Sequence, residues 1–585
     1  MRPASSEKPS IDTTQRPSQV DTNGLESHSA SISADRGTSP AIDAELASTH
    51  EPPDATPELV IGLVTPIGVD GEAVTRLLRD VLASEVDYIG EPIHVIDYLS
   101  AERKVSSEVP DGIEGMEARI DEGNALRERL RRRDAFALYA IRAIFERRAK
   151  LGSVNLSVLE PDRWKEIPSH GRIAYIIRSI KRPEEIQLLR RVYGPWLLVV
   201  SVFATRKVRF QHILEQLVEK GIATPGDRKI ETKINELLDR DAREDYNALY
   251  GQDTRKAFSQ ADLFIDIGGD AENQVRRFIR LVFSDRTRTP TRAEYAMFLA
   301  RAAGLRSSSP GRQVGAVIAD SFGELISAGT NEAPSAHGGY EWDGSDHDLR
   351  DLAQVEGNTF GEMLRKRELI LDTLRRLARL GRGDLADNPT VVTDEARSLI
   401  EANDVDFVET LRKEVLGDSD IDSVIEYQRT VHAEMAALQN AQRHGTAVDG
   451  STMYTTSFPC HICAKHILAA GITRVVYIEP YPKSRAKGFY PDAIRVDGEN
   501  AGADPVAVDP FIGVGPNLYQ RLFSSSGDDR MLADGSIRRW TRGRNNLPRL
   551  GPGNEDQVNS ESIRAIEVSA LLTLGECEEA TKTPE

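Results

Sequence analysis

Short apolar runs alternate with segments in which apolar residues recur at helical spacing. Glu58–Val64 is such a run. A Gly/Pro turn follows it, and then Val74, Leu78 and Leu82 repeat at a helix-like interval. Further helices are predicted at Asp134–Leu151, Glu184–Tyr193 and Ala271–Phe283, and further strands at Trp196–Phe203 and Asp262–Ile267. Strands alternating with helices predict a mostly parallel sheet covered on both faces, so we predict an α/β domain at residues 58–285.

A second α/β pattern starts after Pro290 and is expected to extend to about residue 540. A helix is predicted at Glu294–Gly304, and Asp320–Gly323 joins two β-rich runs as a hairpin. The β-rich runs are Gln313–Ala319 and Leu325–Gly329. The later elements are a helix from about His432, a strand at Thr452–Thr456, a helix at Cys460–Ala470 and a strand at Arg474–Ile478. Residues 343–427 are charged and predict a helical insertion with a solvated face.

The two ends of the chain have a different composition from its middle. Residues 1–57 contain no Phe, Trp or Tyr and are rich in Ser, Thr, Pro, Asp and Glu. Such a segment buries too little apolar surface to offset its chain entropy, so a disordered tail is expected. Residues 541–585 also lack these aromatics and are expected to be mostly flexible, with a short helix around Ser560–Leu572.

Charge and cysteine content narrow the function classes. With 74 basic and 92 acidic residues the net charge is -18, which argues against a protein that coats long nucleic acid. Three cysteines are too few for a disulfide-stapled secreted fold. No secretory h-region and no run of about 18 apolar residues can be read, so no membrane span is expected and a cytoplasmic location is predicted.

Two motifs indicate a metal site. His432 and Glu434 form a His-x-Glu motif, and Pro459, Cys460 and Cys463 form a Pro-Cys-x-x-Cys motif; each opens a predicted helix. Cysteines three positions apart share a helix face, and a helix N-terminus favours the thiolate that ligates zinc. His432 supplies a third ligand. Three protein ligands leave one tetrahedral position open, which is typical of catalytic zinc (Zn²⁺).

Glu434 is expected to move protons and not to bind the metal. It lies two residues from His432 and therefore does not share its helix face. His-x-Glu followed by Pro-Cys-x-x-Cys is the signature of zinc-dependent nucleobase deaminases, in which the Glu is the general acid and base. Ser457 and the backbone around Ala433 are candidate contacts to the substrate ring.

The cysteine pair is also compatible with two other kinds of site. The pair could be a redox couple or half of a structural zinc site, closed by His461 and His466. A four-cysteine zinc ribbon within one chain is excluded because no second Cys pair exists. A structural site would leave the His-x-Glu motif unexplained, so the combined motifs favour catalytic zinc.

Four segments resemble the deoxycytidylate deaminase family over about residues 290–500. They are RSSSPGRQVGAVIAD, ISAGTNEAP, TVHAEMAAL and PCHICAKHILAAGITRVVYIEPYPKS. Within that family the chain is similar to long, two-domain bacterial anti-phage deaminases that carry a P-loop-like domain ahead of the deaminase. The resemblance implies zinc at His432, Cys460 and Cys463, proton transfer by Glu434, and contact of Asn331 with the substrate.

The implied activity is deamination of deoxycytidine nucleotides, dCTP or dCMP, to deoxyuridine nucleotides in phage defence. Simple members of the family usually carry Glu before the Pro-Cys pair, where this chain has Phe458. Lys483 and Arg485 follow a predicted strand and are candidates to bind the substrate phosphate. The alternatives are an RNA- or DNA-editing deaminase and a non-catalytic nucleotide-sensing regulator. A homo-oligomer is expected.

The first domain is expected to be P-loop kinase-like with a degenerate phosphate loop. The segment from Gly62 through Gly68 lies between strand and helix, but Val69 and Asp70 stand where a Walker A loop has Lys and Ser or Thr. No phosphoryl transfer is therefore predicted. Backbone amides can still hold phosphate, so a regulatory nucleotide here and a purely structural domain both remain open.

Overall fold

The computed structural model contains two mainly parallel six-stranded sheets. It describes residues 57–95, 112–156, 159–243, 249–344, 348, 350–351, 361–379, 398, 405–411, 428–481, 484–498, 502–525, 530–532, 534–543, 546–549 and 560–580. The tail expected at residues 1–57 lies outside these ranges except for Pro57.

The first sheet has the strand order β12-β5-β4-β1-β3-β2. All neighbours are parallel except β12, which pairs antiparallel with β5. The strands are β1 (Leu59–Val64), β2 (Ile89–Ile93), β3 (Ile173–Ile177), β4 (Leu197–Phe203), β5 (Leu263–Asp266) and β12 (Gly513–Val514). The continuous apolar runs of β1, β3 and β4 form strands because both sheet faces are buried.

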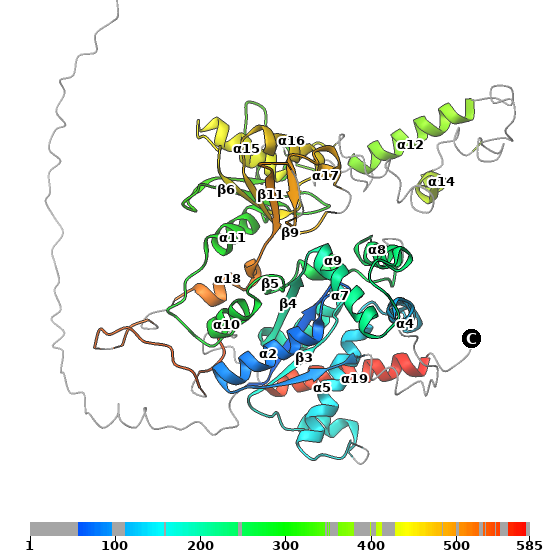
Figure 1. Ribbon diagram of the computed structural model, residues 1–585, viewed down its shortest axis with the longest axis vertical. Coiled ribbons are helices and arrows are strands. Elements are labelled where there is room, and N and C mark those ends of the chain that lie inside the picture. Colours follow the sequence, from blue (N-terminus) through cyan, green and yellow to red (C-terminus); the bar gives the residue numbers. More distant parts are fainter. Residues whose placement is uncertain are drawn as a thin grey trace, which may run out of the picture. The chain divides into compact units, whose positions relative to one another are not determined.

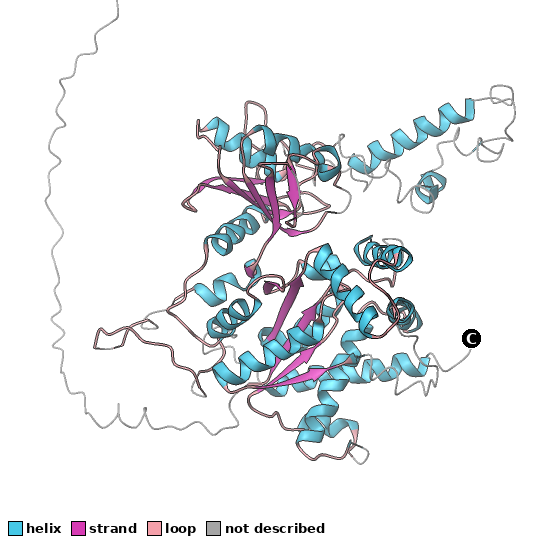
Figure 2. Cartoon of the chain, viewed as in Figure 1, coloured by secondary structure: helices cyan, strands magenta, loops and turns pink. Residues whose placement is uncertain are grey.

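Helices cover both faces of this sheet (Figures 1 and 2). One face packs on α2 (Gly71–Val86) and α10 (Ala271–Val282), and the opposite face packs on α5 (Ala135–Leu151) and α6 (Pro183–Tyr193). The other helices of this region are α4 (Ile113–Arg129), η3 (Pro161–Glu166), η4 (Gly194–Trp196), α7 (Arg206–Glu219), α8 (Arg228–Arg243) and α9 (Thr254–Phe258). A smaller apolar cluster joins α4, α7 and α8.

The second sheet has the order β10-β11-β9-β8-β6-β7. The expected hairpin is confirmed, because β6 (Gly315–Ala319) and β7 (Leu325–Thr330) pair antiparallel. The other strands are β8 (Thr452–Ser457), β9 (Arg474–Glu479), β10 (Ile494–Val496) and β11 (Val506–Pro510). α11 (Arg292–Gly304) packs on one face, and α15 (Ala433–Arg443) and α16 (His461–Ala469) pack on the other. The predicted second α/β domain is thereby confirmed, and its helices form a layer on each face of the sheet.

The C-terminal part of the chain differs from the expectation in two places. β12 and α18 (Pro516–Phe523) belong to the first sheet and its apolar cluster, although the deaminase-like domain was expected to continue to residue 540. α19 (Ser560–Ala580) is longer than the short helix expected in a flexible tail and packs against α5. It is held there by a buried ion pair in which Arg148 binds Glu567 at 2.6 Å.

Within the expected insertion, the structure describes α12 (Gly361–Arg379) and α14 (Val405–Thr410). A four-residue helix, α17 (Ala486–Phe489), follows β9. Among the described residues, no helix is both long and apolar enough to cross a bilayer.

Candidate metal and active site

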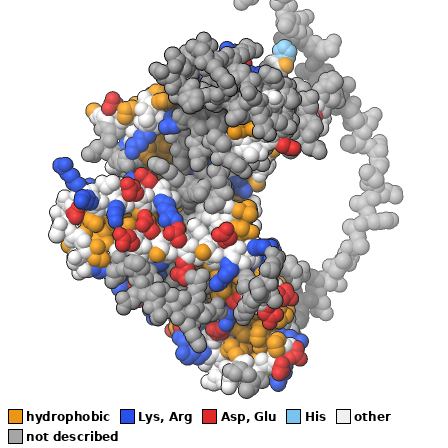
Figure 3. Space-filling view, turned by 90° about the vertical axis from the view of Figure 1, so that its right-hand side faces the viewer, with side chains coloured by type: hydrophobic (Ala, Val, Ile, Leu, Met, Phe, Trp, Pro, Cys, Tyr) orange, Lys and Arg blue, Asp and Glu red, His pale blue; other side chains and the backbone are white. Residues whose placement is uncertain are grey.

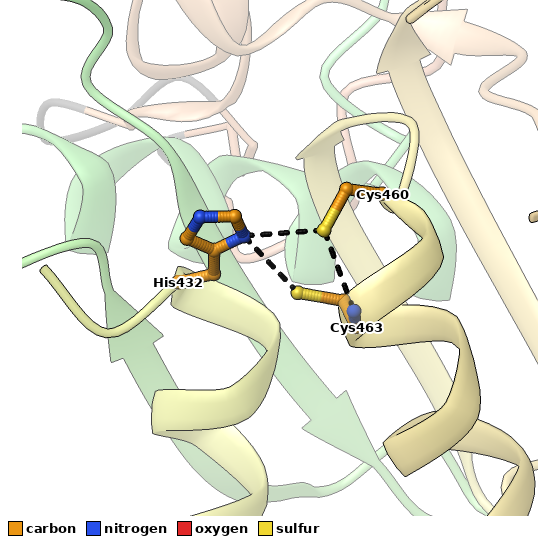
Figure 4. Close-up of side chains that lie close together, drawn as sticks. All are labelled: His432, Cys460 and Cys463. Carbon is orange, nitrogen blue, oxygen red and sulfur yellow. Dashed lines mark hydrogen bonds between the residues drawn. The ribbon is translucent and has the colours of Figure 1, made fainter. Parts of the chain in front are cut away.

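His432, Cys460 and Cys463 converge at the starts of two neighbouring helices (Figure 4). His432 is the N-cap residue of α15 and Cys460 that of α16, with Cys463 in the first turn of α16. Nδ1 of His432 lies 3.3 Å from Sγ of Cys460 and 3.4 Å from Sγ of Cys463. The three ligand atoms all lie within 4.8 Å of one another.

These three residues fit zinc. With Zn–S near 2.3 Å and Zn–N near 2.0–2.1 Å, tetrahedral ligand atoms lie about 3.5 Å apart, close to the spacings from His432. A hydrogen bond with Cys463 and the proximity of His432 lower the pKa of the Cys460 thiol to about 4, against the effect of burial. The thiolate form of Cys460 is therefore available at neutral pH. The hydrogen bond with Cys460 and burial raise the pKa of Cys463, so one thiolate is shared by the metal-free pair. The structure shows His432, Cys460 and Cys463 as a zinc-binding group.

A residue that the sequence did not single out orients the histidine. Oε1 of Gln428 lies 2.7 Å from Nε2 of His432. An amide oxygen only accepts, so this contact assigns the proton to Nε2 and leaves the Nδ1 lone pair free for the metal. Such partners of ligating histidines typically raise metal affinity. Gln428 belongs to no predicted element, so no local pattern indicated its role.

Glu434 lies in the first turn of α15, beside the metal group but not among its ligand atoms. It is 4% exposed, and its Oε2 is 3.5 Å from the Cys463 sulfur, which donates to it. Burial and, to a lesser extent, the negative charge of Cys460 raise the pKa of Glu434 to about 7. A carboxyl group with this pKa can both take and give a proton at neutral pH.

The segment before His432 is tied to the end of β7. The backbones of Glu332 and Val431 exchange two hydrogen bonds, of 3.3 and 3.0 Å. The Glu332 carboxylate is 1% exposed and accepts hydrogen bonds from the backbone and the hydroxyl of Ser308, each 2.9 Å long. This buried network holds the chain that leads into the metal site. Glu332 and Ser308 both lie in segments that resemble the deaminase family, but the sequence did not indicate that they contact each other.

The residues proposed to contact substrate have different surroundings. Oδ1 of Asn331 accepts a hydrogen bond from the Val314 amide, and its Nδ2 donates one to the Arg312 carbonyl, each 2.8 Å long. The side-chain amide therefore holds the backbone segment that leads into β6. Ala433 is fully buried, and Ser457 lies at the end of β8 with 9% of its surface exposed. Lys483 lies outside the described residues.

His461 and His466 do not belong to the described metal group. The ring of His461 instead packs edge-on against Phe489, with 5.6 Å between centroids. The structure therefore gives no support to a site closed by these two histidines.

The loop after β1 is occupied by the protein's own groups. Gly62 lies inside β1, so the loop is shorter than the sequence suggested. Oδ1 of Asp70 accepts from the amides of Glu72 and Ala73 at 3.0 and 2.9 Å, where a bound phosphate would accept them. Gly68 has φ 83°, and a Cβ there would lie 2.8 Å from the Arg209 carbonyl oxygen. This loop is packed and capped, and it does not form an open phosphate cradle.

Comparison with known proteins agrees with the metal geometry. Residues 290–479 match the family described as "Cytidine and deoxycytidylate deaminase zinc-binding region". The deoxycytidylate deaminase of Enterobacteria phage T2 is 46% identical over 74 residues, which are 13% of this chain and 36% of that protein. ComE operon protein 2 of Bacillus subtilis is 45% identical over 53 residues, 9% of this chain and 28% of that protein.

The similarity is confined to part of each protein. The chain spans about a third of the length of these curated relatives. A shikimate kinase from Acinetobacter baumannii superposes over 40% of this chain and 100% of its own, with 13% identity and a TM-score of 0.20. This likeness is too weak to assign a fold family to the first domain. The C-terminal half thus contains a zinc-binding domain of the cytidine and deoxycytidylate deaminase type, with an intact His-Cys-Cys group.

Proposed function

We propose that this protein is a zinc-dependent enzyme that deaminates deoxycytidine nucleotides, dCTP or dCMP, to deoxyuridine nucleotides. The observation that carries the proposal is the position of Glu434. It is buried beside a three-residue metal group, has a pKa of about 7, and is not itself a ligand. Three protein ligands leave a tetrahedral position for water, as a hydrolytic site requires.

The chain's own residues have distinct roles in this proposal. When bound, zinc would supply activation of water at neutral pH. Glu434 takes a proton from the attacking water and delivers it to N3 of the cytosine ring. Glu434 then takes the proton of the new C4 hydroxyl and passes it to the amino group, so that the C4–N bond breaks, ammonia leaves and the C4 carbonyl forms. His432, Cys460 and Cys463 hold the metal, and Gln428 orients His432.

A free nucleotide suits this protein better than a polynucleotide. The net charge of -18 opposes binding to a long phosphate backbone. On the face shown in Figure 3, side chains of both charge signs lie among hydrophobic ones, so the described residues form no broad basic stripe there. One nucleotide needs only a few cations. Asn331, Ala433, Ser457 and Lys483 remain our candidates for contacts to it.

We extend the proposal to the rest of the chain. We propose that residues 58–285 form a P-loop kinase-like domain that does not transfer phosphoryl groups. The side chain of Asp70 caps the first amides of α2, and position 69 carries Val where an active loop has Lys. We also propose that the protein is a homo-oligomer. The resemblance to long two-domain bacterial deaminases supports a role in phage defence through depletion of dCTP.

A substrate panel tests the proposal. The zinc-loaded protein is incubated with dCMP, dCDP, dCTP, CTP and a single-stranded oligodeoxynucleotide, and the products are separated by chromatography. Uracil is expected in the deoxynucleotides and not in the oligonucleotide. Comparable conversion of the oligonucleotide would favour an editing deaminase, and no conversion of any compound would favour a nucleotide-sensing regulator.

A further inference from the structure

A cavity of about 210 Å³ lies at the carboxyl ends of β1 and β4. Pro66 follows β1, Phe203 ends β4 and Ala204 follows it; Tyr477 and Ile478 of β9 also line the cavity. Ligands of open α/β sheets bind at this edge, where strand order reverses. One water needs only about 10–15 Å³ on the same scale, so a much larger ligand fits.

Two residues that line the cavity, Arg209 and Asp241, form an ion pair of 3.5 Å, and each also carries a buried polar atom without a hydrogen-bond partner among the described residues. The side chain of Asp241 is 3% exposed; its Oδ2 accepts from the Ile67 amide at 2.9 Å, and its Oδ1 is buried without a hydrogen bond among the described residues. Nε of Arg209 is likewise buried and unpaired within the described part of the chain. Buried polar groups are normally satisfied. A ligand hydroxyl in contact with both atoms would satisfy them, since a hydroxyl accepts from a guanidinium and donates to a carboxylate.

The charged residues that line the cavity also favour the binding of an anion. Arg206, Arg209 and Arg255 line the cavity against two carboxylates, Asp241 and Asp497. Burial lowers the pKa of Arg209; the charge of Asp241 opposes this effect and that of Arg206 adds to it. A desolvated guanidinium beside a second one is stabilised by a bound anion, and phosphate is the anion that arginine binds in a bidentate manner.

The remaining wall is apolar and aromatic. Phe203, Phe258 and Tyr477 contribute rings, and Pro480 and Pro510 lie at its edge. Such a surface accommodates a flat heterocycle. Arginines for phosphate, a donor–acceptor pair for a sugar hydroxyl, and an apolar wall for a base together describe a nucleoside phosphate.

One residue that lines the cavity, Tyr477, contacts the segment that carries the zinc ligand Cys460. The Tyr477 hydroxyl donates to Oδ1 of Asp497 at 3.2 Å, and both residues line the cavity. The Tyr477 ring packs edge-on against Phe458, with 5.0 Å between centroids. Phe458 stands two residues before Cys460, so a ligand that moves Tyr477 also acts on the segment that carries a zinc ligand.

We propose that this cavity is a second ligand site, for a nucleoside phosphate, and that its occupancy acts on the zinc site through Tyr477 and Phe458. Asp70 already fills the start of α2, so the site lies beside the phosphate loop and not in it. The effect on the zinc site rests on the metal assignment of the proposed function, whereas binding itself does not.

Binding is tested with the zinc-loaded full-length protein and probes that lack cytosine: ATP, GTP, dTTP, thymidine and inorganic phosphate. Calorimetric titration should show that at least one nucleoside triphosphate binds more tightly than thymidine or phosphate. Arg206→Glu should weaken that binding about tenfold or more, because a charge-assisted contact becomes repulsive. Arg206→Ala should weaken it less.

Arg240→Glu is the matched control. Arg240 lies on α8, is 40% exposed and forms an ion pair with Asp121. Arg206 is similar in both respects, since it is 37% exposed and forms an ion pair with Asp239. The control should bind as the parent does. The site would be overturned if no nucleoside phosphate binds, if phosphate alone binds as tightly, or if both Arg206 variants bind as the parent does.

The link to the zinc site is tested without measuring deamination. The rate of zinc release to a chelator should change in the presence of the bound nucleotide in the parent and in Arg240→Glu, but not in Arg206→Glu. Equal rates with and without bound nucleotide would contradict the link. A protein that binds nucleotide and changes its zinc release, yet deaminates nothing, would contradict the proposed function and leave this site intact.

Discussion

Gln428 accepts a 2.7 Å hydrogen bond from Nε2 of His432, on the side of the ring opposite the two cysteines. Replacement by Leu removes the acceptor, so the ring loses its fixed tautomer. We expect zinc affinity, measured by chelator competition, to fall by a factor of ~10–100. Gln211→Leu, at an exposed glutamine paired with Glu215 on α7, should leave affinity unchanged. Parent-like affinity in Gln428→Leu would show that His432 needs no such partner.

Replacement of Cys460 and replacement of Cys577 should have opposite effects on zinc content. Cys460 belongs to the metal group, whereas Cys577 lies on α19. The parent and Cys577→Ala should each hold about one zinc per chain, as one three-ligand site implies. Cys460→Ala should lose the metal. Metal analysis of the purified proteins checks this, and stoichiometric zinc in Cys460→Ala would refute the ligand assignment.

Glu434→Gln keeps the size of the side chain but removes its acid–base function. Turnover should fall by a factor of ~10²–10⁴ or more, since one residue serves several proton transfers. Zinc content and melting temperature should stay close to those of the parent, because Glu434 is not a ligand. Near-normal deamination by this variant would overturn the proton-transfer role.

The zinc ligands could be predicted from the sequence because their spacing within each helix start limits where the side chains point. The strands β1 and β4 were also predictable, because strands that are buried on both faces consist of continuous apolar runs. β2 was missed since it is an edge strand, IGEPI, in which Gly and Pro interrupt the apolar pattern.

Other features depend on contacts between distant segments. β12 has only two residues and is a strand because β5 pairs with it. Gln428 and the Glu332–Ser308 network acquire their roles only when the loops meet. The cavity is lined by the ends of elements that lie hundreds of residues apart, so no local pattern could reveal it.

Glu85 on α2 links the first sheet's helices to the C-terminal segment. Its fully buried carboxylate pairs with Arg276, with Arg280 at 2.8 Å and with Arg542 at 3.0 Å. Burial alone would raise its pKa, but hydrogen bonds from Arg280 and Arg276 and the charges of Arg280 and Arg542 hold the pKa below the ordinary value of 4.5. The stabilisation is therefore complete above pH 4.5 and is lost as pH falls through the lowered pKa.

Glu85→Gln should lower the free energy of unfolding at pH 7 by roughly 1–3 kcal/mol, because it removes the charged acceptor of these bonds. The difference from the parent should shrink below about pH 4. Glu272→Gln, at an exposed carboxylate that also pairs with Arg276, should change stability by less than about 1 kcal/mol. Denaturant titrations at several pH values measure both. A pH-independent difference for Glu85→Gln would contradict the ionised pair.

Reconstitution tests the central claim, zinc-dependent deamination of a deoxycytidine nucleotide, most directly. The protein is stripped of metal, divided, and reloaded with zinc in one half; ammonia released from dCTP and from dCMP is then measured in both halves. Release is expected from at least one nucleotide in the zinc-loaded half, at a rate that Glu434→Gln reduces by a factor of ~10²–10⁴ or more. Equal ammonia release with and without zinc, or none from either nucleotide in the loaded protein, would contradict the account.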